Sequence, residues 1–132
     1  MKTGNNSLLL DNNIVIDLFR GKQEIAKEID KANIVYLPIF ALGELYFGAE
    51  NSGRSHHQMG FIDKFLEISS ILNTSDQTAL IYGRLKKYLK TKGTPIPEND
   101  IWIGSLALEH ELPLVTRDHH FDLLPEIQII SW

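Results

Sequence analysis

The chain has 132 residues, of which 43% are hydrophobic and 23% are charged, and its formal net charge is −4 at pH 7. This composition is ordinary for one globular domain, and it excludes a disordered tail, a low-complexity protein and a protein that holds nucleic acid by bulk positive charge. The chain has no cysteine, which excludes disulfides, cysteine-ligated zinc and thiol catalysis.

The predicted elements of the N-terminal half alternate between short apolar runs and helical segments. The apolar run Ser7–Leu10 predicts a buried strand, and Asn12–Phe19 predicts a short helix. Lys22–Lys31 has apolar residues at helical spacing with charges between them. Ile34–Leu37 predicts a second strand, and Phe40–Glu50 predicts a further helix.

The C-terminal half continues the alternation. After a helix at His56–Glu67 and a strand within Ile68–Leu72, a long helix is predicted from the cap Ser75 to about Lys92, before Gly93. The last predicted elements are a helix from Glu98 to about Glu111 and strands at Leu114–Thr116 and Ile127–Ile130. Short strands between helices are typical of βαβ units, so we expect an α/β fold with a parallel sheet and helices on both faces.

No apolar run in the chain approaches the length of about 18 residues that a membrane span requires. The first apolar stretch, at Leu8–Phe19, is interrupted by polar and acidic residues, so it does not resemble a signal peptide. We therefore expect a cytoplasmic protein without a membrane segment.

Four acidic residues occupy unusual positions in this pattern: Asp11, Glu44, Asp100 and Asp118. Asp11 and Asp118 follow predicted strands directly, and ligands of parallel sheets bind at that edge. Glu44 lies in an apolar helix, where an isolated carboxylate is costly unless it is paired or binds a cation. Because neighbouring carboxylates repel each other, and Mg²⁺ or Mn²⁺ removes that penalty, the four acids predict a site for one of these ions.

Three of the four acids also have a structural explanation. Asp11 and Asp118 could cap the helices that follow them. Asp100 lies in the first turn of a predicted helix, where the helix dipole favours an acidic residue. Capping does not explain Glu44.

The segments LLLDNNIVIDLF, ALGELYFGA, ENDIWIGSLAL and LPLVTRDHHFD resemble the PIN-domain family, specifically the VapC-type toxins of prokaryotic toxin–antitoxin pairs. The resemblance runs from Leu8 to Trp132 and implies a single PIN domain over residues 1–132. It implies a three-layer α/β/α sandwich with a five-stranded parallel sheet, and an endoribonuclease that hydrolyses RNA with Mg²⁺ or Mn²⁺ held by the four acids. The implied partners are the RNA substrate, a cognate antitoxin and a second copy in a homodimer.

The same resemblance implies roles for neighbouring polar residues. Asn13 and Thr116 match residues that hold the carboxylates in place. Asn12 departs from the family, which usually has Thr or Ser after the first acid, although an amide can still donate a hydrogen bond to a carboxylate. Beyond Asp118, we expect Asp122 to be exposed or to assist the site, and His119 and His120 to be loop or surface residues.

An acid-free basic segment lies within the long predicted helix: Arg84, Lys86, Lys87, Lys90 and Lys92. Such a run is usually a solvated helix face. The functional alternative is that Lys86, Lys87 and Lys90 contact the phosphates of RNA beside the acidic site.

Aromatic residues are concentrated around Glu44. The helical stripe places Phe40, Leu45, Tyr46 and Phe47 mostly in the core. More aromatic residues lie here than one face needs, and the resemblance implies a groove in which the antitoxin blocks the site. We expect Tyr46 or Phe47 to line that groove.

Two alternatives to a ribonuclease remain open. A PIN-like domain could bind RNA or protein without cutting, although degenerate domains are expected to lose some of the acids. Another Mg²⁺-dependent phosphohydrolase is the weaker alternative. The paired aspartates of haloacid-dehalogenase-type phosphatases are absent, because Asn13 stands where the second aspartate belongs.

Overall fold

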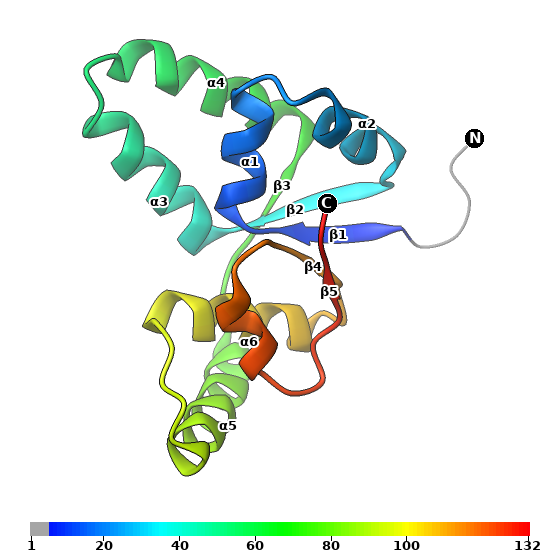
Figure 1. The fold of residues 1–132 in the computed structure, drawn as a ribbon, viewed down its shortest axis with the longest axis vertical. Coiled ribbons are helices and arrows are strands. Elements are labelled where there is room, and N and C mark those ends of the chain that lie inside the picture. Colours follow the sequence, from blue (N-terminus) through cyan, green and yellow to red (C-terminus); the bar gives the residue numbers. More distant parts are fainter. Residues whose placement is uncertain (1–5) are drawn as a thin grey trace.

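Five parallel strands form one sheet in the computed structural model of the chain, which describes residues 6–132 (Figure 1). The strands are β1 (Ser7–Leu10), β2 (Ile34–Pro38), β3 (Ser70–Leu72), β4 (Leu114–Val115) and β5 (Ile129–Ile130). Their order across the sheet is β3-β2-β1-β4-β5, and every neighbouring pair is parallel. The expected parallel α/β architecture is confirmed.

Within residues 6–132, six α-helices and one short 3₁₀ helix cover the two faces of this sheet. The α-helices are α1 (Asn12–Phe19), α2 (Gln23–Lys31), α3 (Ile39–Glu50), α4 (Ser55–Ile68), α5 (Asp76–Lys92) and α6 (Glu98–Glu109), and the 3₁₀ helix is η1 (His119–Leu123). The first four lie on one side of the sheet, and α5 and α6 lie on the other (Figure 1). The expected three-layer sandwich is thus confirmed.

Alternation along the central strand builds a separate core on each face of the sheet. In β1, Leu8 and Leu10 pack into the core with α1–α4, whereas Leu9 packs into the core with α5 and α6. Successive side chains of a strand point to opposite faces, so a strand covered on both faces is apolar throughout. The apolar run Ser7–Leu10 is therefore the sequence that a central parallel strand needs.

Helix termini follow local sequence signals where such signals exist. Ser75 caps α5 through a reciprocal hydrogen-bonded box with Thr78, and Gly93 ends the helix in the left-handed region at φ 70°. The next helix, α6, ends at Glu109, two residues before the expected Glu111. Glu111 itself adopts φ 51°, a conformation that usually belongs to glycine, so the sequence contained no stop signal there.

The sheet topology brings two polar residues together at the carboxyl edge. Leu10 at the end of β1 pairs with Val115 at the end of β4, so the next residues, Asp11 and Thr116, are neighbours. The backbone N–H of Asp11 donates a 3.0 Å hydrogen bond to the carbonyl of Val115. From β1 the chain proceeds to β2 on one side, and β4 lies on the other. This reversal of strand order is where open α/β sheets bind ligands.

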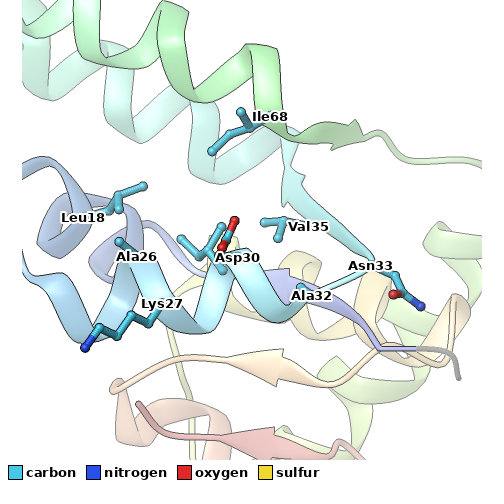
Figure 2. Close-up of a pocket in the computed structure, with 9 residues that line it drawn as sticks. Leu18, Ala26, Lys27, Asp30, Ala32, Asn33, Val35 and Ile68 are labelled. Carbon is cyan, nitrogen blue, oxygen red and sulfur yellow. The ribbon is translucent and has the colours of Figure 1, made fainter. Parts of the chain in front are cut away.

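A hollow beside α2 lies away from that edge. It is lined by residues of α1, α2, β2 and the end of α4, including Leu18, Ala26, Val35 and Ile68 (Figure 2). None of the four acids lines it. No helix among the described residues has the length and apolar character to span a membrane.

Candidate active site

Asp11 is the most buried of the four acids, with 4% of its surface exposed. It precedes α1, and its Oδ1 accepts a 2.8 Å hydrogen bond from the backbone N–H of Asn12. The pKa of Asp11 is raised to about 6, and burial is the largest cause. Hydrogen bonds from Thr116 and Asn12 oppose this rise, whereas the charges of Asp100 and Glu44 add to it. A negative charge at this position is therefore unfavourable unless a cation neutralises it.

Two polar side chains orient the other oxygen of Asp11. The hydroxyl of Thr116 donates a 2.8 Å hydrogen bond to Asp11 Oδ2, and the Asn13 amide donates a longer one of 3.4 Å to the same atom. The Oδ1 atom of Asn13 is buried and has no hydrogen-bond partner among the described residues. Buried polar atoms are usually paired with protein or ordered water, so this oxygen marks a place for a solvent molecule or ligand.

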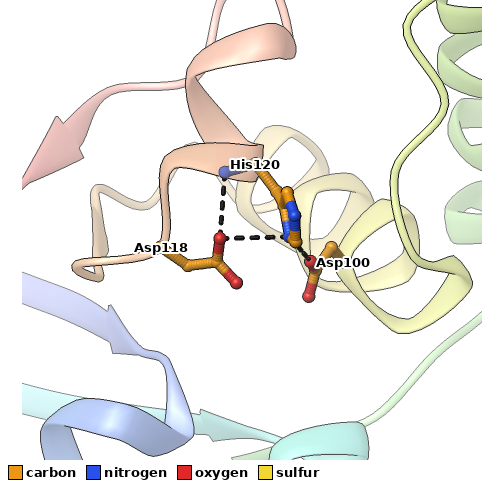
Figure 3. A group of neighbouring side chains, drawn as sticks. All are labelled: Asp100, Asp118 and His120. Carbon is orange, nitrogen blue, oxygen red and sulfur yellow. Dashed lines mark hydrogen bonds and ion pairs between the residues drawn. The ribbon is translucent and has the colours of Figure 1, made fainter.

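Asp100 and Asp118 are joined by His120 (Figure 3). The Nδ1 atom of His120 lies 3.0 Å from Asp100 Oδ2 and 3.1 Å from Asp118 Oδ1. The backbone N–H of His120 also donates a 2.9 Å hydrogen bond to Asp118 Oδ1, which caps η1. Burial raises the pKa of Asp100, the hydrogen bond with His120 lowers it, and the charge of Asp118 raises it; the hydrogen bond with Asp100 raises the pKa of His120.

These three residues have a geometry that could hold a metal ion. Asp100, Asp118 and His120 each offer a ligand atom, and these atoms lie within 4.8 Å of one another. Carboxylate and imidazole groups both bind divalent metals. The group is at the mouth of the site rather than in the core, because His120 is exposed and Asp118 is half-buried.

Glu44 completes the cluster from α3. Its carboxylate is half-buried, not enclosed within the core, and it is held by two amides. Asn12 Nδ2 donates a 2.8 Å hydrogen bond to Glu44 Oε2, and Asn99 Nδ2 donates a 3.1 Å hydrogen bond to Glu44 Oε1. Asn12, the residue that departs from the family pattern, therefore links helix α1, which follows Asp11, to Glu44.

The site carries an excess of negative charge. The charges of Asp100 and Glu44 raise the pKa of Asp11, and the charges of Asp118 and Glu44 raise the pKa of Asp100. In the described part of the chain, no lysine or arginine forms an ion pair with any of the four; Arg117, beside Asp118, pairs instead with the buried Asp17. A cluster of four carboxylates fits a divalent cation.

The structural and functional explanations of the acids are both visible in this geometry. Asp11 and Asp118 do cap the helices that follow them, and Asp100 does lie in the first turn of α6. Asp122 contacts His119 at 3.0 Å on the surface and does not join the four acids.

Sequence reasoning missed two contributors to the cluster, His120 and Asn99. His120 is exposed, as expected, but its contacts with Asp100 and Asp118 were not predicted, and its position two residues after Asp118 was the available signal. The contact of Asn99 with Glu44 joins α6 to α3 across 55 residues. No local pattern in the sequence indicates that contact.

The basic residues of α5 lie on its exposed face. The ammonium group of Lys86 pairs with Glu98 and also contacts the Tyr82 hydroxyl. Lys87 and Lys90 are exposed and form no ion pair within residues 6–132.

The aromatic residues of α3 divide between core and surface. Leu45 is buried and Tyr46 packs at the edge of the core, but Phe47 is 69% exposed. Phe47 therefore lies outside the core in which the helical stripe placed most of these residues, and it is exposed, as the alternative expectation of a groove at Tyr46 or Phe47 requires. The stripe does not identify the buried face, because α3 is apolar on nearly all sides.

Comparison with known proteins agrees with this geometry. Residues 8–127 match the family described as PIN domain. The chain is 30% identical over 127 residues to "Ribonuclease VapC2" of Haemophilus influenzae and 29% identical over 127 residues to "tRNA(fMet)-specific endonuclease VapC" of Salmonella typhimurium. Each alignment covers 94% of this chain and 96% of the relative.

A solved structure shows the same fold over almost the whole chain. It is VapBC2 from Rickettsia felis bound to a DNA fragment from their promoter, and it superposes with a TM-score of 0.90 at 25% sequence identity. The superposition covers 96% of this chain and 98% of that one.

Proposed function

This chain belongs to the PIN-domain family, and we propose that it is a metal-dependent endoribonuclease, the toxin of a VapBC-type toxin–antitoxin pair. The observation that carries the proposal is the buried carboxylate of Asp11 within a cluster of four acids that no lysine or arginine neutralises in the described chain. Catalysis by a divalent metal explains why such a costly arrangement is maintained.

We infer that Asp11, Glu44, Asp100 and Asp118 hold the cation, and that it is Mg²⁺ or Mn²⁺. When bound, the ion polarises the scissile phosphodiester and lowers the pKa of an attacking water. Oxygen ligands favour these two ions, and the chain has no cysteine to favour zinc.

The protein's own groups keep the carboxylates in position. Thr116 and Asn13 orient Asp11, while Asn12 and Asn99 orient Glu44. His120 spaces Asp100 from Asp118 by contacting both. Partners of this kind fix ligand orientation and tune affinity, so these residues are positioning residues in the proposal. A carboxylate of the cluster, Glu44 or Asp118, orients the attacking water.

The proposed partners follow from the family. The RNA substrate and a cognate antitoxin are the first two, and the toxin is proposed to act as a homodimer in the cytoplasm. On the face of α5, Lys87 and Lys90 are proposed to contact RNA phosphates. Lys86 is proposed as a weaker contact, because its ammonium group already pairs with Glu98.

The test is cleavage of single-stranded and stem-loop RNA by the purified protein, with and without metal. We expect cleavage in Mg²⁺ or Mn²⁺, loss of cleavage in excess EDTA and recovery when metal is added back. Cleavage that is undiminished in excess EDTA would contradict the proposal. RNA binding without cleavage in any divalent metal would instead support a non-catalytic PIN-like module.

A further inference from the structure

The outer face of α3 carries a hollow beside the four acids. Its lining residues are Ile39, Phe40, Gly43, Glu44, Phe47 and Asn99. Two of them, Glu44 and Asn99, also belong to the candidate active site, where a 3.1 Å hydrogen bond joins them. The hollow is therefore continuous with the site, and apolar groups or bare backbone form the rest of it.

Aromatic rings form one side of the hollow. Phe47 lies one helical turn beyond Glu44 on the same face of α3, and 69% of its surface is exposed. Phe40 is half-buried, and its ring stacks on Trp102 with centroids 5.8 Å apart and an interplanar angle of 15°. Trp102 in turn stacks on Tyr82 at 4.0 Å, so Phe40 is backed by two further rings and is held in place.

Gly43 keeps the hollow open without serving the fold. Glycine is a poor helix former, and Gly43 lies in the interior of α3. A Cβ atom at Gly43 would meet no other atom within 4 Å, whereas a Cβ at Gly104 in α6 would lie 2.5 Å from Leu124 Cδ1. A Cβ atom at Gly104 would therefore displace the side chain of Leu124, whereas packing does not require a glycine at position 43.

We propose that this hollow binds one unpaired base of the RNA, next to the bond that is cut, by stacking the base against Phe47 and Phe40. The inference rests on the ribonuclease function proposed above. Aromatic side chains hold splayed-out RNA bases in this way with little dependence on sequence. The base itself is uncharged, so Glu44 does not repel it, while its phosphate extends toward the four acids.

Asn99 is placed to contact the edge of such a base. Its side chain is exposed, and one N–H of the amide is used by Glu44. The remaining N–H and the carbonyl oxygen offer one donor and one acceptor, the combination that base edges accept. We infer that Asn99 contributes base preference and that the rings contribute affinity.

A second copy of the chain fits this hollow less well than RNA does. In a two-fold dimer the same patch lies on both sides of the interface, so both copies of Glu44 would be brought into one interface. None of the six lining residues is a lysine or arginine that could neutralise the two carboxylates. An antitoxin segment over Phe47 would exclude the base and is a competing occupant.

Steady-state cleavage by four variants tests the proposal. Phe47→Ala removes the exposed ring, and Gly43→Leu fills the hollow. The matched controls are Ile68→Ala, which truncates a residue that is 60% exposed elsewhere, and Gly60→Ala, which fills a helical glycine that also has nothing within 4 Å of its Cβ position.

We expect KM to rise about tenfold in Phe47→Ala and Gly43→Leu, the effect of losing about 1.4 kcal/mol of base stacking. The kcat at saturating RNA should change by less than about threefold, since the groups that hold the metal are intact. Both controls should keep the wild-type KM. Gly43→Leu should also melt about 3 °C above the wild type, because leucine favours the helix more than glycine does.

A binding measurement locates the base directly. After the cleaved bond is mapped, 2-aminopurine is placed on each side of it in RNA bound to Asp100→Asn, which keeps the hollow. We expect fluorescence quenching at one of the two positions, and loss of that quenching when Phe47→Ala is added.

The outcomes separate this inference from the proposed function. A wild type that cleaves RNA, with unchanged KM in Phe47→Ala and Gly43→Leu, overturns the base subsite alone. The base subsite alone is also overturned if these two variants keep the wild-type KM and lose only antitoxin binding or self-association. A wild type that cleaves no RNA in any divalent metal overturns the proposed function, and the subsite with it.

Discussion

The hydroxyl of Thr116 donates a 2.8 Å hydrogen bond to Oδ2 of Asp11, although 105 residues separate the two in the chain. The same hydroxyl oxygen accepts a 3.0 Å hydrogen bond from the backbone N–H of Asp118. One fully enclosed side chain therefore sets the spacing between the acid that follows β1 and the acid that follows β4. This contact makes the central pair of strands a support for the proposed metal site.

Thr116→Val removes this hydroxyl while keeping the shape of the side chain. We expect metal affinity to fall by about 10- to 100-fold, as is usual when a partner of a metal ligand is removed. We also expect a loss of about 1 kcal/mol in the free energy of unfolding, because the partly buried Asp118 N–H loses its acceptor. Thr116→Ser should retain most of both, as measured by metal titration and denaturant unfolding; equal losses in the two variants would contradict this role.

The pH dependence of stability should report the buried charge of Asp11. Its pKa is about 6 in the folded, metal-free protein and about 3.8 when unfolded. A raised carboxylate pKa favours the folded state at low pH, and that contribution is lost as pH rises from about 4 to about 6. We expect the metal-free wild type to lose up to about 3 kcal/mol of unfolding free energy through Asp11 over this window.

Asp11→Asn should lack that loss while keeping its cap on α1, since an amide oxygen can accept the same N–H. The comparison needs chemical denaturation of both proteins in EDTA between pH 4 and pH 7. A variant that is less stable than the wild type at pH 7 would show that the capping charge matters more than the burial penalty.

Metal binding should stabilise the wild type by mass action. At 100 times the dissociation constant we expect about 2.7 kcal/mol, which appears as a higher melting temperature in Mg²⁺ or Mn²⁺ than in EDTA. Asp100→Asn should show a much smaller shift, because it removes one carboxylate from the group with Asp118 and His120. A shift of the same size in Asp100→Asn would place the bound ion elsewhere.

The basic face of α5 should supply affinity for RNA through phosphate contacts. Changing Lys87 and Lys90 together to Gln should make the slope of log K for RNA binding against log salt concentration shallower by about 1.4. Each contact with a single strand contributes about 0.7 to this slope. Adding Lys86→Gln should change the slope by less than about 0.7 more, since Glu98 already neutralises Lys86.

Filter binding at several salt concentrations measures these slopes. The matched control is the double variant Lys27→Gln with Lys64→Gln, which removes two exposed lysines from α2 and α4. An unchanged slope in the α5 variant would mean that this face is only solvated.

The sequence was sufficient to predict the parts of the fold that depend on local chemistry. Asn12–Phe19 was predicted at its observed bounds, and Ser75 and Gly93 marked the ends of α5 because a cap and a left-handed glycine each have a local cause. The 3₁₀ helix η1 and the early end of α6 were not predicted. Glu111 turns the chain without a glycine, so tertiary packing rather than propensity fixes that turn.

The candidate site was predictable only in part, for a similar reason. The four acids stood out because strand ends and an apolar helix are unusual places for carboxylates. Asn99 and His120 could not be identified as site residues from the sequence, because exposed amides and histidines are common. Only the fold brings Asn99 to Glu44 and His120 to Asp100. The sequence left Phe47 between the core and a groove, because α3 lacks a polar side that would identify its buried face.

The proposed function requires that the four carboxylates act as one metal site, and Mn²⁺ titration by calorimetry measures this most directly. The variants are Asp11→Asn, Glu44→Gln, Asp100→Asn and Asp118→Asn, and the control is Asp122→Asn, an exposed acid that contacts only His119 among the described residues. We predict that each of the four weakens Mn²⁺ binding at least about tenfold, within the range for losing a metal ligand or its partner, and abolishes RNA cleavage. Asp122→Asn should bind Mn²⁺ and cleave RNA as the wild type does. Wild-type Mn²⁺ affinity in any two of the four variants would contradict the shared site.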